Sequence, residues 1–144
     1  MSFRIIQVKT ETDFKPYYHL RWQLLRAPWG EAEGSETDDI ESACFHVMAV
    51  DNEQVVGVAR LQFNSDDEAQ LRYMAVTPTH EKQGIGRALV ATVEQQAQKS
   101  SHKIIMLHAR ENAVGFYKKL GYRLIEKSYL LFDEIQHFHM SKRL

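Results

Sequence analysis

The sequence has little of several features that would mark a special class of protein. It contains one cysteine, Cys44, so it cannot form an internal disulfide, and no apolar run approaches the roughly 18 residues that span a membrane. Its net charge of -1 gives no general reason to expect nucleic acid or an anionic membrane as a partner. It shows no internal repeat, no low-complexity tract, no linker and no apolar signal segment. These absences favour a protein of the reducing cytoplasm.

The composition that is present is that of an ordinary globular domain. With 144 residues, 44% hydrophobic and 26% charged, the chain is long enough for one sizeable core, and we expect a single domain over residues 1–144. Cys44 lies in the apolar run 43–50, which predicts a buried structural thiol rather than a nucleophile.

Hydrophobic periodicity switches repeatedly between strand and helix. It predicts strands over residues 3–8, 43–50, 55–63, 70–76 and 103–109, helices over 10–26, 84–99 and 112–120, and further strands between 122 and 144. Short polar turns join the three central strands, so we expect them to pair antiparallel. Residues 70–109 form a strand, a helix and a strand, which requires one parallel, right-handed crossover. The predicted class is α/β (α+β), with a mixed and mostly antiparallel sheet.

A pair of glycines stands where the strand at 70–76 gives way to a helical pattern. The first N–H groups of a helix lack partners and carry partial positive charge, so they bind anions that can approach the backbone. Glycine removes the side chains that would block such an approach. The alternative is a tight loop that only lets the helix pack on the sheet. The loop that could hold a pyrophosphate consists of Gln83, Gly84, Ile85, Gly86, Arg87 and Ala88.

Two stretches of the chain resemble one known family. Residues 71–97, LRYMAVTPTHEKQGIGRALVATVEQQA, are similar to the acetyl-CoA-binding motif of the GCN5-related N-acetyltransferase (GNAT) superfamily. Residues 109–122, ARENAVGFYKKLGY, resemble its second motif, and the likeness in element order covers residues 3–140. The resemblance implies a six- to seven-stranded sheet flanked by about four helices. It also implies an opening between the fourth and fifth strands, where the pantetheine arm of acetyl-CoA lies.

The resemblance further implies roles for particular residues. Tyr117 resembles in position the tyrosine beside the CoA sulfur, and a phenol of pKa about 10 can protonate a departing thiolate. A core tyrosine packed on its neighbour is the alternative. Besides the glycine loop, the residues expected to contact acetyl-CoA are Met74, Ala75, Val76, Asn112 and Phe116.

Two positions depart from the family's pattern. Glu81 stands where members often have Arg or Gln, and a carboxylate there opposes phosphate binding unless it faces solvent or is offset by Lys82. Arg110 stands where many members have Asn, and Asn112 is two positions out of register with that role.

The sequence says less about which residues bind the acceptor amine. The acidic segment 29–42 follows the first helix, which borders the acceptor site in this family, so its carboxylates could attract a cationic amine or simply be solvated. The candidate substrate-binding residues are Arg26, Trp29, Glu31, Glu36 and His108.

Four histidines could act as bases or ligands. His46 and His108 lie on predicted strands, where neutral imidazole can accept a proton near pH 7, although a purely structural role is commoner. His137 and His139 share one face of the last strand, but no cysteine or carboxylate completes a set, so no metal is predicted.

The sequence therefore predicts an acetyl-CoA-dependent N-acetyltransferase in which an unidentified primary amine attacks the thioester directly. A non-catalytic acyl-CoA-binding or sensing module of the same fold is the alternative. A dinucleotide site is disfavoured because Leu89 stands where the third glycine would be. No nucleic acid or membrane partner is expected. A homodimer through the final strands, with Phe138 and Met140 at the sheet edge, stays open.

Overall fold

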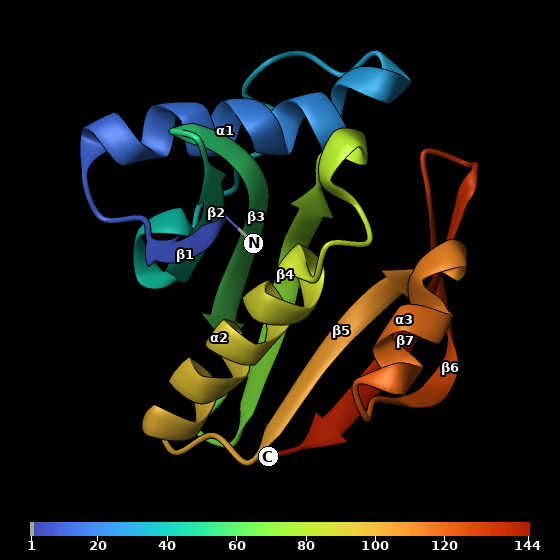
Figure 1. The fold of residues 1–144 in the computed structure, drawn as a ribbon. Coiled ribbons are helices and arrows are strands. Elements are labelled where there is room, and N and C mark those ends of the chain that lie inside the picture. The colour runs from blue at the N-terminus through green and yellow to red at the C-terminus, as the bar shows by residue number, and fades with distance from the viewer. Residues whose placement is uncertain (1) are drawn as a thin grey trace.

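The computed structural model describes residues 2–144, which form a seven-stranded sheet in the order β1-β2-β3-β4-β5-β7-β6 (Figure 1). Every strand pairing in it is antiparallel except that of β4 with β5. The strands are β1 (Arg4–Gln7), β2 (Phe45–Asp51), β3 (Gln54–Phe63), β4 (Glu68–Val76), β5 (Ile104–Arg110), β6 (Arg123–Leu131) and β7 (Ile135–Arg143). The helices are α1 (Glu11–Leu25), α2 (Ile85–Lys99) and α3 (Val114–Lys119), with short 3-10 turns η1 (Ala27–Trp29), η2 (Glu41–Ala43), η3 (Pro78–His80) and η4 (Glu111–Ala113).

The element order, the mixed sheet and the parallel crossover predicted from the sequence are confirmed. Local signals account for the boundaries: the Thr10 hydroxyl accepts the Asp13 N–H at 3.0 Å and caps α1. Gly121, with a φ of 96°, follows α3 in the left-handed conformation that glycine adopts readily. Residues 2–144 contain three α-helices, slightly fewer than the about four that the family resemblance implies, and the segment between α1 and β2 forms only 3-10 turns.

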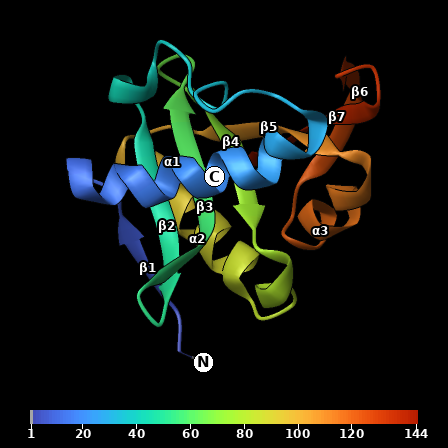
Figure 2. The ribbon, with the colours of Figure 1, turned by 90° about the horizontal axis from the view of Figure 1, so that it is seen from above.

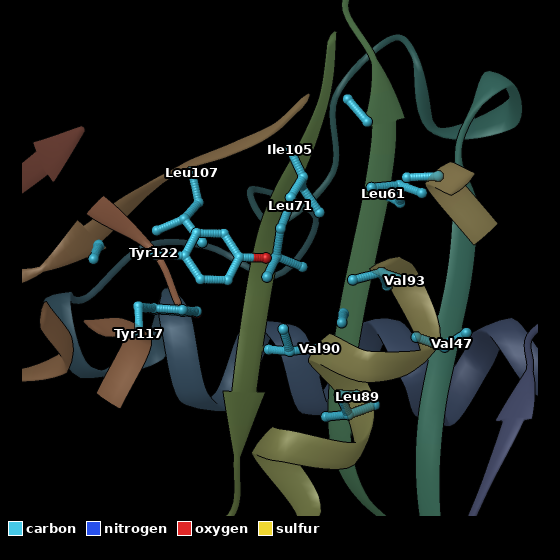
Figure 3. Packing of buried hydrophobic residues seen from close by; sticks show 14 of the residues in the cluster. Val47, Leu61, Leu71, Leu89, Val90, Val93, Ile105, Leu107, Tyr117 and Tyr122 are labelled. Atoms are coloured by element: carbon cyan, nitrogen blue, oxygen red, sulfur yellow. The ribbon is translucent and has the colours of Figure 1, made fainter. Parts of the chain in front are cut away.

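The two long helices cover opposite faces of the sheet. Figure 3 shows α2 in front of the strands and α1 behind them, and Figure 2 shows α1 crossing β2, β3 and β4. Alternate residues of β2 divide accordingly: Val47 and Ala49 pack in the cluster with α2, and Met48 and Val50 pack in the cluster with α1. Burying a side chain such as Leu89 completely contributes about 2 kcal/mol relative to leaving it exposed.

The strands β4 and β5 separate soon after they pair. Their parallel register runs only from Glu68 opposite Ile104 to Gln70 opposite Met106, whereas both strands continue beyond it. A bulge in β4 contributes, because Tyr73 has a φ of 52° and the register with β3 shifts there. A bulge bends its strand and increases the local twist. The last residues of β4 consequently have one edge without a strand partner among residues 2–144 (Figure 1).

Two sequence-based expectations need correction. Strand β7 lies between β5 and β6, and Met140 is fully buried, so Phe138 and Met140 are on an interior strand and the edge at this end of the sheet is β6. Cys44 is partly exposed rather than buried, because it follows η2 and precedes β2, where its Sγ donates to the Ile40 carbonyl at 3.2 Å. Of the helices described, none is long and apolar enough to cross a membrane.

Candidate active site

A cavity of about 540 Å³ occupies the opening between the diverging parts of β4 and β5. Its lining runs from Glu81 and Lys82, which precede α2, to Arg26 at the end of α1, so it includes residues from both faces of the sheet. The cavity brings together eight residues that the sequence singled out: Met74, Ala75, Val76, Asn112, Phe116 and Tyr117 for acetyl-CoA, and Arg26 and His108 for the acceptor.

The start of α2 presents unpaired backbone N–H groups. Gly84 has a φ of 87°, and the first helical hydrogen bond runs from the Ala88 N–H to the Gly84 carbonyl at 3.0 Å. The N–H groups of Ile85, Gly86 and Arg87 donate to no acceptor in the described part of the chain. A helix terminus of this kind attracts anions, which meets the physical requirement of a pyrophosphate loop.

The side chains of residues 83–88 contribute less to this anion site than the backbone N–H groups do. Ile85 is buried in the core, whereas Gln83 and Arg87 point to solvent, and none of the loop residues 83–88 lines the cavity. A Cβ at Gly86 would lie 3.2 Å from Cζ of Phe116. The absence of a side chain at Gly86 therefore also allows α2 to pack closely against α3, whereas the alternative expected from the sequence was packing of the helix on the sheet.

Tyr117 lies on α3 with its hydroxyl 3.7 Å from the Met74 sulfur, at the unpaired part of β4. Its side chain is buried, and its ring packs edge-on against Phe116 and Tyr122 at centroid distances of 5.0 and 5.6 Å. Burial raises the pKa of the Tyr117 phenol, so the hydroxyl keeps its proton at neutral pH. The protonated Tyr117 hydroxyl can thus donate a hydrogen bond to a group lying along β4.

Two histidines line the cavity. His137 is buried, its Nδ1 donates to the Ile135 carbonyl at 2.9 Å, and the Tyr129 ring stacks on it at 4.4 Å. Burial lowers the pKa of His137 despite the hydrogen bond to Ile135, so Nε2 of the neutral ring carries a lone pair. Burial also lowers the pKa of His108, whose Nδ1 lies 3.0 Å from the Ser128 hydroxyl.

His139 lies beside His108 at a ring distance of 5.5 Å and does not line the cavity. The structure, from residue 2 onward, contains no cluster of three or more His, Cys, Asp or Glu side chains placed to share a metal ion.

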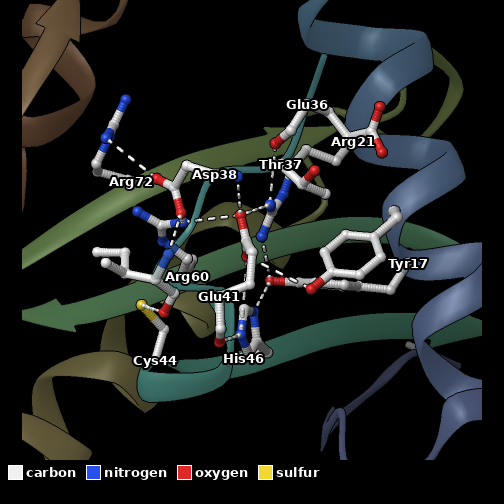
Figure 4. Close-up of polar contacts among 12 residues, drawn as sticks. Tyr17, Arg21, Glu36, Thr37, Asp38, Glu41, Cys44, His46, Arg60 and Arg72 are labelled. Atoms are coloured by element: carbon white, nitrogen blue, oxygen red, sulfur yellow. Dashed lines mark hydrogen bonds and ion pairs between the residues drawn. The ribbon is translucent and has the colours of Figure 1, made fainter. Parts of the chain in front are cut away.

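Two carboxylates of the acidic segment, those of Asp38 and Glu41, bind buried arginines, and neither lines the cavity. Glu41 Oε2 accepts from Arg21 and from Arg60, each at 2.8 Å, and Asp38 accepts from Arg60 at 2.8 Å (Figure 4). The Arg60 hydrogen bond holds the pKa of Asp38 below its usual range. Both arginine side chains are fully buried. Because Arg21 lies on α1, Glu41 on η2 and Arg60 on β3, the network joins these three elements.

His46 belongs to the same network, which excludes it as a catalytic base. Its Nε2 lies 2.7 Å from the Glu41 carbonyl and its Nδ1 lies 2.8 Å from the Tyr17 hydroxyl. Because the carbonyl can only accept, Nε2 carries the proton of the neutral ring, and burial lowers the pKa of His46. Neither ring nitrogen is left for a substrate.

Three of the candidate acceptor residues do not reach the cavity. Glu36 is buried within its own loop, where its carboxylate accepts the Gly34 N–H at 2.8 Å, and Glu31 is exposed to solvent. Trp29 stacks on Phe132 of the β6–β7 turn at 5.8 Å. The acidic attraction of a cationic amine is therefore not supported: Asp38 and Glu41 bind Arg60 and Arg21 instead.

Sequence reasoning missed several residues that line the cavity. Arg72 and Tyr73 stand within the first family motif, two residues or fewer before Met74, and this closeness to the expected acetyl-CoA contacts was an available signal. Tyr129 and His137 come from the last two strands. No local signal shows that this hairpin folds back against β5, because β5–β7 pairing is a long-range contact.

The comparisons with known proteins agree with the geometry. The sequence model of the Acetyltransferase (GNAT) family matches residues 14–122, which is more than half of the chain. The chain therefore belongs to the GNAT acetyltransferase family. It is 27% identical over 139 residues to the uncharacterized N-acetyltransferase YjcF of Bacillus subtilis, with 96% of this chain and 99% of that protein covered.

Solved structures share the fold at lower sequence identity. A GNAT family acetyltransferase from Elizabethkingia anophelis with acetyl-CoA bound has a TM-score of 0.80 at 17% identity, with 99% of each chain covered. The ribosomal-protein-S18-alanine N-acetyltransferase from Escherichia coli has a TM-score of 0.78 at 24% identity, with 98% of this chain and 93% of that chain covered.

Proposed function

We propose that this chain is an acetyl-CoA-dependent N-acetyltransferase whose acceptor is a primary amine. The observation that carries the proposal is the opening between β4 and β5, where an unpaired strand edge, the free N–H groups of α2 and the Tyr117 hydroxyl lie around or beside one cavity. The pantetheine arm would lie along residues 74–76, flanked by Asn112 and Phe116, and the pyrophosphate would bind at residues 83–88.

Acetyl transfer then proceeds by direct attack. The neutral amine forms a C–N bond to the thioester carbonyl carbon, and the carbonyl oxygen gains negative charge, which a backbone N–H near Met74 or Val76 stabilises. The C–S bond breaks as the Tyr117 hydroxyl gives its proton to the departing thiolate. The attacking nitrogen must lose one proton, so a base is needed on the acceptor side.

His137 is our candidate for that base. Its Nδ1–H donates to the Ile135 carbonyl, which leaves Nε2 free to accept a proton. Because its pKa is lowered, the His137 ring is uncharged at pH 7. His108 is the second candidate, because it also lines the cavity with a lowered pKa.

Replacing His137 with glutamine is expected to lower kcat/KM about 100-fold, the usual contribution of a positioned general base. A base with a lowered pKa stays active below pH 6.5, so the wild-type rate should begin to fall only at lower pH, and the variant should lose this fall. The measurement is a pH profile of kcat/KM. His139→Gln is the matched control on the same strand, and loss of the fall in His108→Gln alone would transfer the role to His108.

The proposed function itself is tested by thermal-shift titration with acetyl-CoA, CoA and NAD, followed by thiol release with a panel of amines. We expect stabilisation by both CoA species but not by NAD, with thiol release that depends on an amine. Stabilisation without turnover on any amine would favour the non-catalytic acyl-CoA-binding module. No response to CoA would contradict both functions. A cytoplasmic location stays part of this proposal.

A further inference from the structure

Positive charge is concentrated in the part of the cavity that Arg26, Arg72 and Arg110 line, which we call the acceptor side. Two carboxylates lie near this region: Glu41 binds both buried arginines, Arg21 and Arg60, and Asp38 binds Arg60. Five guanidinium groups lie in the same region as these two carboxylates. They belong to Arg21, Arg26, Arg60 and Arg72, which lie against the Tyr73 ring, and to Arg110, which lies near Arg26.

Three of these arginines line the cavity with little neutralisation. Among residues 2–144, neither Arg26 nor Arg110 forms an ion pair, and the Arg26 guanidinium donates only to the Leu25 carbonyl, at 2.9 Å. Arg72 approaches Asp38 at 3.8 Å, but that carboxylate is already bound by Arg60 at 2.8 Å. The Arg72 side chain is 35% exposed, so it is open to a ligand.

Aromatic rings hold these guanidinium groups in place without neutralising them. The Tyr73 ring lies 4.7 Å from the Arg72 guanidinium and 5.5 Å from that of Arg26, and the Trp29 ring lies 5.0 Å from that of Arg110. Burial, with the nearby Arg26 charge, lowers the pKa of Arg110, so its charge is costly in the free protein.

The arginines lie apart from the expected pyrophosphate site. Arg26 follows α1, which covers the face of the sheet opposite α2, whereas the pyrophosphate loop begins α2. Arg72 shares the Tyr73 ring with Arg26, and the Arg26 charge acts on Arg110, so the other two guanidinium groups lie near that of Arg26. Glu81 is the one carboxylate in the described cavity lining, and it stands on the α2 side with Lys82. The positive charge of the three arginines is therefore available to the second substrate.

We infer that the acceptor amine carries an oxyanion group, a carboxylate or a phosphate, that binds the guanidinium groups of Arg26, Arg72 and Arg110. This inference rests on the proposed transferase function and names the substrate class of the same site. A guanidinium presents a planar fork of donors that matches carboxylate and phosphate oxygens. Binding an anion there would supply the counter-charge that the folded chain lacks, and would hold the amine within the cavity that Tyr117 and His137 line.

The experiment measures binding to the CoA-saturated protein by calorimetry, with acetylated probes that cannot react. N-acetylglycine is compared with N-acetylglycinamide, and N-acetyl-O-phosphoethanolamine with N-acetylethanolamine, so each pair differs in the anion. We expect the anionic member of one pair to bind at least about tenfold more tightly than its neutral partner, as a charge-assisted hydrogen bond allows. The pair that shows the difference identifies carboxylate or phosphate as the anion.

The variants Arg72→Gln and Arg110→Gln should abolish this preference, whereas Arg123→Gln, an exposed arginine on β6 outside the cavity, should retain it. Equal affinity within both pairs, no binding of any probe, or a preference that survives both variants would overturn the inference. So would weaker CoA binding in these variants with unchanged probe binding, which would assign the arginines to CoA. Failure of acetyl-CoA itself to bind would contradict the proposed function. In that case the four probes are titrated into the protein without CoA, and the same comparison within each pair tests whether the three arginines bind an oxyanion.

Discussion

Replacing Tyr117 with phenylalanine is expected to lower kcat about 100-fold, because the leaving thiolate loses its proton donor. The affinity for acetyl-CoA should change little, since the ring that packs on Phe116 and Tyr122 remains. Folding stability should also be nearly unchanged, because the hydroxyl's one described contact is the weak one to the Met74 sulfur at 3.7 Å. The measurements are steady-state kinetics, an acetyl-CoA titration and a thermal melt.

Tyr122→Phe is the matched control. The Tyr122 hydroxyl donates to the Glu94 carboxylate at 2.8 Å, and the residue does not line the cavity. We expect its removal to leave kcat unchanged and to cost about 1 kcal/mol of stability, the net value of a hydrogen bond. A kcat for Tyr117→Phe that stays within about twofold of the wild type would show that Tyr117 is only a packing residue.

Replacing Glu41 with glutamine is expected to destabilise the protein by about 3 kcal/mol, because it leaves buried guanidinium charge without its main partner. Arg21 and Arg60 are fully buried and share one Glu41 oxygen at 2.8 Å each. The Nε atoms of both arginines already lack partners in the described structure, so no spare acceptor can replace the carboxylate. For a chain of this size the melting temperature should fall by about 6–12 °C.

The exposed neighbour Asp39 supplies the control, since its side chain makes no hydrogen bond or ion pair within residues 2–144. Asp39→Asn should stay within about 0.5 kcal/mol of the wild type, as is usual for surface changes. Equal melting temperatures for the two variants would mean that the Glu41 network contributes nothing to stability. Because the Tyr73 ring lies 4.4 Å from Arg21 and 4.8 Å from Arg60, loss of Glu41 should also disturb the cavity wall.

Much of the fold could be read from the sequence because its signals are local. The stripe Ile85, Leu89, Val93 and Ala97 is wholly buried along α2, as helical spacing predicted. The short polar turns between β2, β3 and β4 predicted antiparallel pairing, which the registers confirm. Neighbouring residues determine such features, so one continuous segment carries enough information.

The charge of the residues on the acceptor side could not be predicted from the sequence in the same way. In the sequence, Glu36, Asp38 and Glu41 look like members of a solvated acidic loop. In the structure two of them neutralise Arg21 and Arg60, which come from α1 and β3. The pairing of charges depends on which distant segments meet, and no local pattern records it.

The sequence by itself determined the family, the turn before α2 and the position of Tyr117 in α3, because each rests on contiguous residues with a recognisable spacing. Only the tertiary structure decided the charge at the acceptor side. It paired Asp38 and Glu41 with two buried arginines and brought Arg26, Arg72 and Arg110 from separate parts of the chain to one cavity. The physical reason is that electrostatic balance in a cavity follows from distances across the fold, whereas strand and helix periodicity follows from distances along the chain.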